Sequence, residues 1–216
     1  MGTKRMPATE RKKQILASSI PVFAAHTYHG ATTKALAESA GVTEALIYRY
    51  FGSKRALFLE TIDHTSGRIV RGLERTIEEH EGDPQATVQA CFEFYVGMLK
   101  ESDHFARMFF LVLSELDQED IREVYLPHQR RAIGLLTHKL EEWQRVGFVQ
   151  SGLNIESAAW LFFGSYLVLA LVQHSRDSFD VDVEKAISMA KPFFGWSSDA
   201  TPGPDQPAQQ GPDTPT

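Results

Sequence analysis

Hydroxyl and cationic side chains that could bind a polyanion gather between positions 32 and 54 of this 216-residue chain. Threonine hydroxyls, lysines and the backbone N–H groups at helix starts are the usual protein partners of phosphate groups. Hydroxyl and cationic residues in this stretch include Thr32, Lys34, Thr43, Arg49 and Lys54. Their chemistry is non-covalent recognition of a charged polymer rather than catalysis.

Two charged residues in this stretch have more than one interpretation. Arg49 could pair with the edge of a guanine or with a phosphate. Glu44 is unusual beside phosphates, and it could accept a hydrogen bond from a cytosine amine or act as a capping charge that repels wrong sites. Both residues share a polar and aromatic helix face with Thr43 and Tyr48.

The charge distribution also points to a polyanionic partner for the start of the chain. Residues 1–58 contain nine Lys and Arg against three acidic residues, which makes this segment +6. The rest of the chain is −12, and the whole chain is −6. A basic segment on an acidic body favours a nucleic acid as partner, although a solvated basic helix face would look the same.

The elements expected to position these side chains are two short helices joined by a tight turn. Thr32 and Thr43 are suited to cap helices at about 32–40 and 44–51, and Gly41 suits the left-handed turn between them. This spacing predicts a helix-turn-helix whose second helix fits the major groove of DNA. The alternative is a plain helical hairpin, in which Tyr48, Tyr50 and Phe51 would belong to the core.

The stretch from about residue 10 to residue 58 resembles the tetracycline-repressor (TetR) family of regulators. The resemblance is carried at fixed spacing by Phe23, residues 30–33, Leu36-Ala37, residues 40–43, residues 48–51 and Ser53-Lys54. One departure is Thr27, which stands where many members have a glycine that ends the first helix. This departure leaves the local turn geometry uncertain but touches no contact residue.

The resemblance implies a DNA-contact role for each matching residue. Thr32, Thr33 and Lys34 match the helix start that contacts phosphates in the family, and Lys54 matches a phosphate anchor. The first turn of the recognition helix, nearest the bases, corresponds to Thr43, Glu44, Ala45 and Leu46. The aromatic segment that packs on the DNA backbone and groove wall corresponds to Tyr48, Arg49 and Tyr50.

Helical periodicity continues through the body, and no alternating β-branched run suggests a sheet, so the fold class is all α. About nine helices are expected, near 8–26, 32–40, 44–51, 54–80, 84–101, 104–116, from about Pro127 to 146, 154–176 and 181–194. The expected domains are a DNA-binding head over 1–55 and an effector-binding and dimerisation domain over 56–196. The Pro- and Gly-rich tail, 197–216, is expected to be disordered.

Residues 158–172 are apolar all round, so every face of this helix should be buried. Its uncharged run is long enough for a membrane span, but polar ends shorten the truly apolar part, and we reject that interpretation. A two-fold seam between two copies explains it better. The resemblance implies that this helix and the next form the dimer interface, with Trp160, Phe163, Gly164, Leu167, Leu171, Ile187 and Phe194 as expected contacts.

Aromatic residues and methionines are frequent in the middle helices. They predict either an ordinary core or an apolar pocket for a small effector. The expected pocket residues are Tyr95, Met98, Phe105, Met108, Phe109 and Trp143.

These features together predict a ligand-responsive, homodimeric regulator that binds a palindromic operator in double-stranded DNA. Repression is the usual mode in the resembling family. We expect a cytoplasmic protein that needs no cofactor or metal, because the chain shows no zinc-site, phosphate-loop or nucleophile motif and its single cysteine excludes an intramolecular disulfide. The rival interpretations are an enzyme and a helical interaction module that does not bind DNA.

Overall fold

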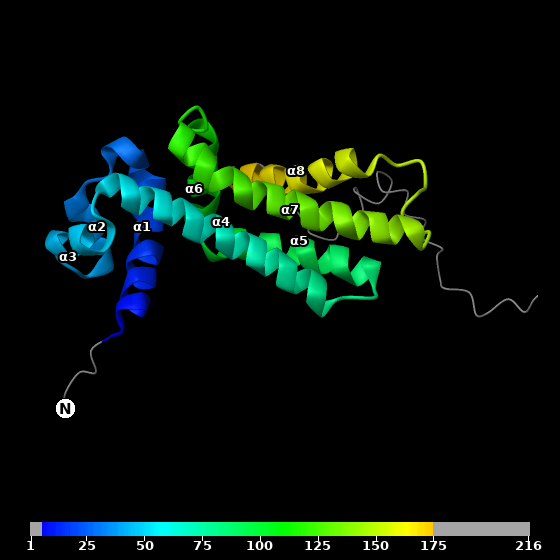
Figure 1. Ribbon diagram of the computed structural model, residues 1–216, viewed down its shortest axis with the longest axis horizontal. Helices are drawn as coiled ribbons and strands as arrows, with labels where there is room; N and C mark the ends of the chain where they lie inside the picture. Colours follow the sequence, from blue (N-terminus) through cyan, green and yellow to red (C-terminus); the bar gives the residue numbers. More distant parts are fainter. Residues whose placement is uncertain (1–5, 175–216) are drawn as a thin grey trace, which may run out of the picture.

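A computed structural model describes residues 6–174 of the chain (Figure 1). The described part is all helical, as predicted, and contains no strand. Its eight helices are α1 (Ala8–Gly30), α2 (Thr33–Ala40), α3 (Glu44–Phe51), α4 (Lys54–Glu79), α5 (Pro84–Glu101), α6 (Asp103–Ser114), α7 (Glu119–Arg145) and α8 (Ile155–His174). The expected helix at 181–194 and the tail at 197–216 lie outside the described residues.

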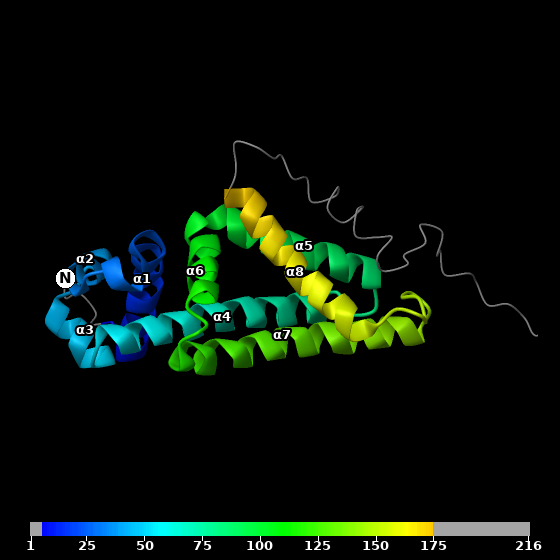
Figure 2. The same ribbon diagram turned by 90° about the horizontal axis from the view of Figure 1, so that it is seen from above.

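The helices form a small head at one end and a longer body (Figures 1 and 2). Helices α1, α2 and α3 make the head, and α4 starts there and runs into the body. Helices α4 and α7 lie side by side along the body, while α6 stands between α1 and the rest (Figure 2). None of the helices within residues 6–174 combines the length and apolarity that a membrane crossing needs.

Side-chain caps start the short helices of the head where the sequence predicts them. The hydroxyl of Thr32 accepts from Ala35 N at 3.1 Å, and that of Thr43 accepts from Leu46 N at 3.3 Å. Gly41 follows α2 with φ of 64°, a left-handed conformation that glycine adopts without a Cβ clash. These local interactions confirm the predicted bounds of α2 and α3 to within a residue.

The prediction that a helix begins near Pro127 is wrong. Helix α7 begins eight residues earlier, at Glu119, and carries Pro127 in its interior. A proline inside a helix removes one backbone hydrogen bond and costs about 3 kcal/mol. The residues before the proline include Ile121 and Tyr125, which are both buried in the body, and this packing offsets the local cost.

Helix α1 contains a kink at Thr27, next to its predicted end at His26. Thr27 has φ of 59° and ψ of 176°, and it is the one residue other than glycine with positive φ in the described part of the chain. Such backbone angles are strained for a β-branched residue and cost on the order of 1–3 kcal/mol. The kink turns the chain toward α2.

Replacing Thr27 by glycine should stabilise the protein by about 1 kcal/mol. Glycine removes the strain, but it also makes the unfolded chain more flexible, which lowers the free energy of unfolding by roughly 0.4–1 kcal/mol. The Thr27 side chain is exposed, so its loss should remove little packing. The control is Ala25→Gly on the regular, exposed part of the same helix, which should destabilise by about 0.5–1 kcal/mol. Urea unfolding measures both changes. A Thr27→Gly protein less stable than the parent would contradict the strain argument.

Candidate nucleic-acid interface

The head is built around apolar residues that fix α3 against its neighbours. Leu36, Ala37 and Ala40 of α2 are buried against Ile47 and Phe51 of α3, as the spacing predicts. Behind them, the Phe58 ring of α4 packs on Phe23 of α1, with ring centroids 4.8 Å apart. Helix α3 is therefore held by its inner face, and its outer face is left open to solvent.

The outer face of α3 carries the residues predicted to read DNA. Thr43, Glu44, Ala45 and Arg49 are exposed, and the Tyr48 side chain is 49% exposed. Leu46 and Tyr50 are half-buried at the edge of this face. The plain-hairpin alternative placed Tyr48 and Tyr50 in the core, but of its three aromatic residues only Phe51 is buried there.

The start of α2 lies next to this face. Thr32 and Lys34 are exposed and Thr33 is half-buried. The hydroxyls of Thr33 and Tyr48 lie 3.3 Å apart, which joins the start of α2 to the middle of α3. The N-terminus of α2 and the outer face of α3 thus form one continuous polar surface.

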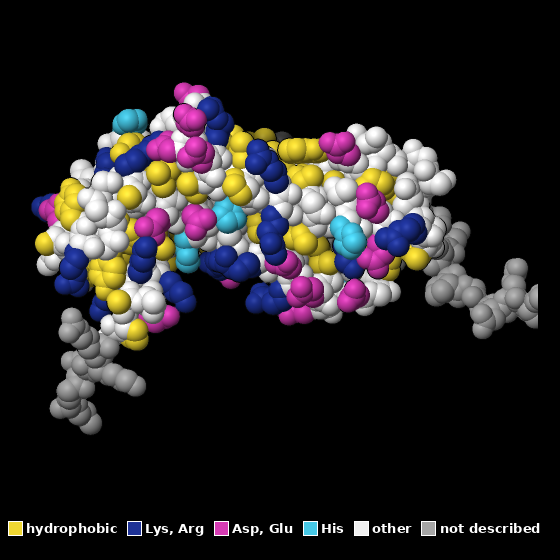
Figure 3. Space-filling model, in the orientation of Figure 1, with side chains coloured by type: hydrophobic (Ala, Val, Ile, Leu, Met, Phe, Trp, Pro, Cys, Tyr) yellow, Lys and Arg dark blue, Asp and Glu magenta, His cyan; other side chains and the backbone are white. Residues whose placement is uncertain are grey.

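A hollow of about 650 Å³ lies between the start of α1 and the outer face of α3. Arg11 and Arg49 approach it from these two helices, and Thr43 and Tyr50 also line it. Cationic side chains lie over this end of the molecule (Figure 3). Arg11 was not among the site residues that the sequence predicted, because only its place in a cluster of basic residues at 11–13 marked it.

Lys54 has a structural role that the sequence did not predict. Its ammonium donates to the carbonyl oxygens of Tyr28 and Ala31, both at 2.9 Å, and it lies 4.6 Å from the centroid of the Tyr28 ring. These bonds hold the end of α1 against the start of α4. A phosphate contact by Lys54 would have to use its remaining N–H.

The predicted pocket residues of the body fall into three places. Phe105, Met108 and Phe109 of α6 line a small cavity together with residues of α4 and α7. Tyr95 and Met98 of α5 are buried nearby but do not line the cavity. Trp143 packs on Phe148 near the end of α7, with ring centroids 5.9 Å apart.

The cavity holds only about 10 Å³, so the site is nearly closed. Such a volume has room for about one water molecule and not for an organic effector. An effector entering here would have to displace α6 from α4 or α7.

Helix α8 has one buried and one exposed apolar face. Ala159, Phe162, Tyr166 and Ala170 are buried in the body. On the other side, large apolar side chains are exposed to solvent, namely Trp160 (46%), Leu161 (63%), Val168 (60%) and Leu171 (57%).

Of the predicted dimer contacts, Trp160 and Leu171 are exposed on this face, and Phe163, Gly164 and Leu167 are half-buried. Ile187 and Phe194 lie outside the described residues. A soluble monomer rarely leaves so many large apolar side chains together in water, so this face marks an interaction surface.

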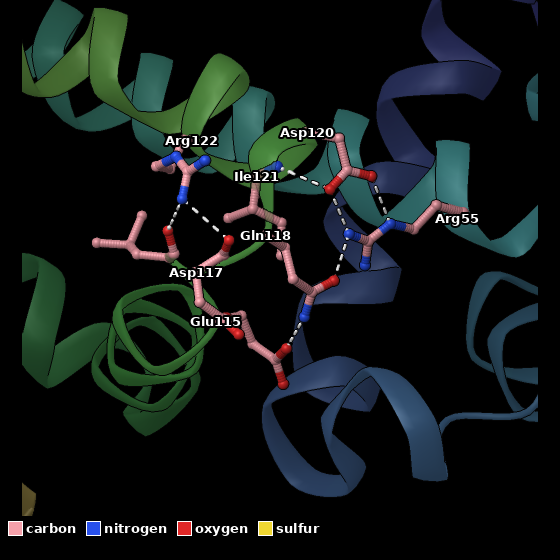
Figure 4. Close-up of polar contacts among 8 residues, drawn as sticks. Arg55, Glu115, Asp117, Gln118, Asp120, Ile121 and Arg122 are labelled. Carbon is pink, nitrogen blue, oxygen red and sulfur yellow. Dashed lines mark hydrogen bonds and ion pairs between the residues drawn. The ribbon is translucent and has the colours of Figure 1, made fainter.

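Arg55, Gln118 and Asp120 form a contact between the head and the body that we call the Arg55 latch (Figure 4). Arg55, one residue after α4 begins, donates to Asp120 Oδ2 through Nε at 2.7 Å and to Gln118 Oε1 through Nη2 at 2.6 Å. Its second bond to Asp120 makes the pair bidentate, which is the strongest geometry for this ion pair. The latch joins the start of α4 to Gln118, just before α7, and to Asp120 in the first turn of α7.

The Arg55 latch shifts the pKa of both ionised partners toward their charged forms. The hydrogen bond from Arg55 holds the pKa of Asp120 below its ordinary value. The reciprocal bond to Asp120 raises the pKa of the Arg55 guanidinium.

Asp120→Asn should lower the free energy of unfolding by up to about 1 kcal/mol at pH 7, the upper end for a partly exposed pair. A carboxyl whose pKa is depressed by folding stabilises fully above its unfolded pKa of about 3.9 and loses this effect as the pH falls through the folded value. The difference from wild type should therefore disappear in acid. Urea unfolding between pH 7 and pH 2.5 tests this. Arg55→Met should also lower the free energy of unfolding at pH 7 and lose this effect in acid. A difference between Asp120→Asn and wild type that persists at the lowest pH would contradict the role assigned to the Asp120 carboxylate.

Comparison with known proteins finds a family model and relatives that share this architecture. Residues 15–61 match the model described as bacterial regulatory proteins, tetR family. The HTH-type transcriptional activator FasR of Mycolicibacterium smegmatis is 32% identical over 93 residues, which is 42% of each chain. The chain thus aligns with less than half of FasR. The fatty acid metabolism regulator protein of Bacillus subtilis is 23% identical over 155 residues, 70% of this chain and 77% of the relative.

Solved structures show the same fold over most of the chain. FadR from Bacillus subtilis in complex with stearoyl-CoA superposes with a TM-score of 0.70 at 20% identity, over 84% of this chain and 97% of that one. The fatty acid degradation regulator FadR from Bacillus halodurans gives a TM-score of 0.68 at 21% identity, over 89% and 95% of the two chains.

Proposed function

We propose that the chain is a regulator of the TetR family and acts as a homodimeric repressor that an apolar effector releases from a palindromic operator. The observation that carries this proposal is the exposed outer face of α3. The helix itself is capped at both ends, and its inner face is buried in the head through Ile47 and Phe51. A helix of this size enters the major groove, where each base pair presents a distinct set of donors and acceptors.

Within the head, we assign DNA contacts to the exposed residues of α2 and α3. Thr32, Thr33 and Lys34 bind phosphates beside the groove. Thr43, Glu44, Ala45 and Leu46 lie nearest the bases, and Tyr48, Arg49 and Tyr50 contact the groove wall. Arg11 adds a cation across the hollow from Arg49.

A second copy of the chain covers the exposed face of α8. Burying its large apolar side chains in a two-fold interface removes them from water, and an isologous dimer presents two recognition helices. These helices must lie roughly 34–36 Å apart to enter successive major grooves, so the operator is a palindrome. The dimer contacts on α8 are Trp160, Phe163, Gly164, Leu167 and Leu171, with Ile187 and Phe194 proposed to extend them.

The effector we propose is a fatty-acyl compound that enters between α4, α6 and α7. Two observations support this class. The cavity is lined mainly by apolar side chains and by no charged one, and the Bacillus subtilis FadR structure contains stearoyl-CoA. In this arrangement 1–55 is the DNA-binding head, 56–196 is the effector-binding and dimerisation domain, and 197–216 is a tail. The protein acts in the cytoplasm, where its operator is accessible.

Two contacts connect the effector site with the head. Helix α6 lines the cavity and also packs against α1 of the head. The connection after α6 carries Gln118, which bonds Arg55 at the start of α4. An effector that pushes α6 aside therefore moves both supports of the head. A coupling of about 1–3 kcal/mol would weaken operator binding roughly 5- to 150-fold.

Selection of binding sites from random duplex DNA tests the proposal. We expect paired, inverted half-sites and a log–log salt slope near about −5 if roughly six phosphates are neutralised. Saturating acyl-CoA should then lower the affinity for the selected operator. Single half-sites, or equal affinities with and without acyl-CoA, would contradict the proposal.

The direction of regulation needs its own test, because FasR is named as an activator. A reporter gene behind the selected operator should be silent with the protein present and expressed when the effector is added. Expression that requires the protein would replace repression by activation and leave the DNA-binding proposal intact.

A further inference from the structure

Two buried tyrosine hydroxyls in the body have no hydrogen-bond partner among the described residues, Tyr125 Oη of α7 and Tyr166 Oη of α8. The Tyr125 side chain is 4% exposed and that of Tyr166 is 2% exposed. Buried hydroxyls are normally hydrogen-bonded, since each loses its bonds to water on folding. Two such groups in one region are a feature that the fold itself does not explain.

One of the two tyrosines lines the cavity between α4, α6 and α7, and the other lies behind a lining residue. Tyr125 is one of its lining residues. Phe109, which also lines it, packs edge-on against both rings, with centroids 6.4 Å from Tyr125 and 5.3 Å from Tyr166. Displacement of the Phe109 ring would therefore open a path from the cavity to both hydroxyls.

The chemistry of the surroundings limits what these hydroxyls can bind. The residues that line the cavity in the described part of the chain are Ile62, Thr65, Ser66, Ile69, Phe105, Met108, Phe109, Val112 and Tyr125, and none is charged. Arg68 lies over the Phe105 ring at 5.0 Å, but it is half-exposed and paired with Glu101 at 3.0 Å. A carboxylate placed at the tyrosines would be buried without a cation, which is strongly unfavourable.

Burial keeps both hydroxyls protonated. It raises the pKa of Tyr125 to about 12. The pKa of Tyr166 is also raised, mainly by burial and further by its neighbour Tyr125. Both groups are therefore neutral donors at physiological pH, and a neutral donor suits a carbonyl oxygen.

We propose that Tyr125 and Tyr166 recognise the uncharged carbonyl group of a long-chain acyl ester or thioester, and that this site excludes the free fatty acid. The inference rests on the proposed effector site and states which chemical form of the acyl group it accepts. The apolar lining takes the chain, and the two hydroxyls donate to the carbonyl oxygen in place of their missing partners.

Calorimetric titration of the full-length protein without DNA tests this proposal. The probes are dodecanoyl-CoA, methyl dodecanoate, dodecanoate and dodecane at pH 7.5, with the octadecyl series as a repeat. We expect the thioester and the methyl ester to bind and the carboxylate to bind at least about tenfold more weakly, because burying its charge unpaired is costly. Dodecanoate binding as tightly as its methyl ester would overturn the proposal, and so would an ester and thioester that do not bind.

Variants that lack one of the two tyrosine hydroxyls distinguish a role in ligand binding from a role in stabilising the fold. Tyr125→Phe and Tyr166→Phe should each weaken ester binding about three- to tenfold, as expected for one neutral hydrogen bond, and should leave dodecane binding unchanged. Their melting temperatures without ligand should stay equal or rise, since an unpartnered polar group is lost. The control is Tyr95→Phe, whose ring packs on Tyr166 at 4.8 Å but does not line the cavity, and it should keep full ester affinity.

The two proposals fail in different measurements. Unchanged ester affinity in both tyrosine variants, or a lower melting temperature that reveals a structural partner, would overturn the role of the hydroxyls. Tyrosine-dependent ester binding that leaves operator affinity unchanged would instead contradict the proposed function and leave the ligand chemistry standing.

Discussion

Introducing two carboxylates on the exposed face of α8, as Leu161→Glu with Val168→Glu, should convert the proposed dimer into monomers and lower operator affinity roughly a thousandfold. The wild-type side chains are 63% and 60% exposed in one chain and become buried between two copies in the proposed dimer. Charges buried there without partners would prevent association. A monomer holds only one half-site, so its binding approaches the non-specific level, commonly 10³-fold or more below specific binding.

Light scattering after gel filtration measures the oligomeric state, and a mobility shift at fixed salt measures operator affinity. The matched control is Val146→Glu, because Val146 is the comparably exposed apolar residue (71%) at the end of α7. This control should remain dimeric and bind the operator normally. Monomers that keep operator selectivity, or a double variant that stays dimeric, would show that α8 does not form the interface.

Arg49→Ala should weaken operator binding at least about thirtyfold without affecting folding. Arg49 is exposed on the outer face of α3 and its guanidinium lies 5.6 Å from the Tyr50 ring, so its loss removes little packing. A bidentate pair with guanine contributes about 1–3 kcal/mol of discrimination, and the dimer makes this contact twice. The expected loss of operator affinity is therefore larger than one contact would give, because each half of the two-fold complex loses the same contact.

The sequence preference of the Arg49→Ala protein separates the two roles considered for this residue. A guanine contact predicts relaxed selectivity at one position of each half-site, whereas a phosphate contact predicts uniform weakening over all sequences. The control is Arg75→Ala, which removes the same charge from an exposed site on α4 next to Glu79. Operator affinity equal to wild type in the Arg49→Ala protein would remove this residue from the interface.

The structure links these two predictions through α4 and α6. Helix α4 begins in the head at Lys54, whose ammonium caps the end of α1, and continues along the effector cavity. Helix α6 packs on α1 and ends at the connection that carries the Arg55 latch. A change in the body can therefore reach the head by two routes, and in the proposed dimer it would alter the spacing between the two copies of α3.

Local signals made much of the head and of its boundaries predictable from sequence. Thr32, Thr43 and Ser53 each cap the helix that follows them, and Asp83-Pro84 begins α5 at the predicted residue. These signals work because a cap bonds to an N–H only two or three residues away. Thr27 was marked only by its departure from the resembling family, and the structure gave its backbone angles.

Contacts between distant segments were not predictable, and they account for what the sequence analysis missed. Pro127 is a local signal for a helix end, but the burial of Ile121 and Tyr125 carries α7 through it. The Arg55 latch joins residues 65 positions apart. The cavity between α4, α6 and α7 also depends on how distant helices pack, and Trp143, which was expected in the effector pocket, is not among its lining residues.

The sequence by itself predicted the all-helical fold and the helix-turn-helix, and it carried the resemblance to the TetR family, because periodicity, caps and turn glycines act over a few residues. Only the tertiary structure decided that the cavity between α4, α6 and α7 is nearly closed, that Lys54 holds α1, and that two buried tyrosine hydroxyls find no hydrogen-bond partner among residues 6–174. These properties depend on which helices pack together. Packing arises from contacts between residues that are far apart in the sequence, so local sequence patterns do not predict it.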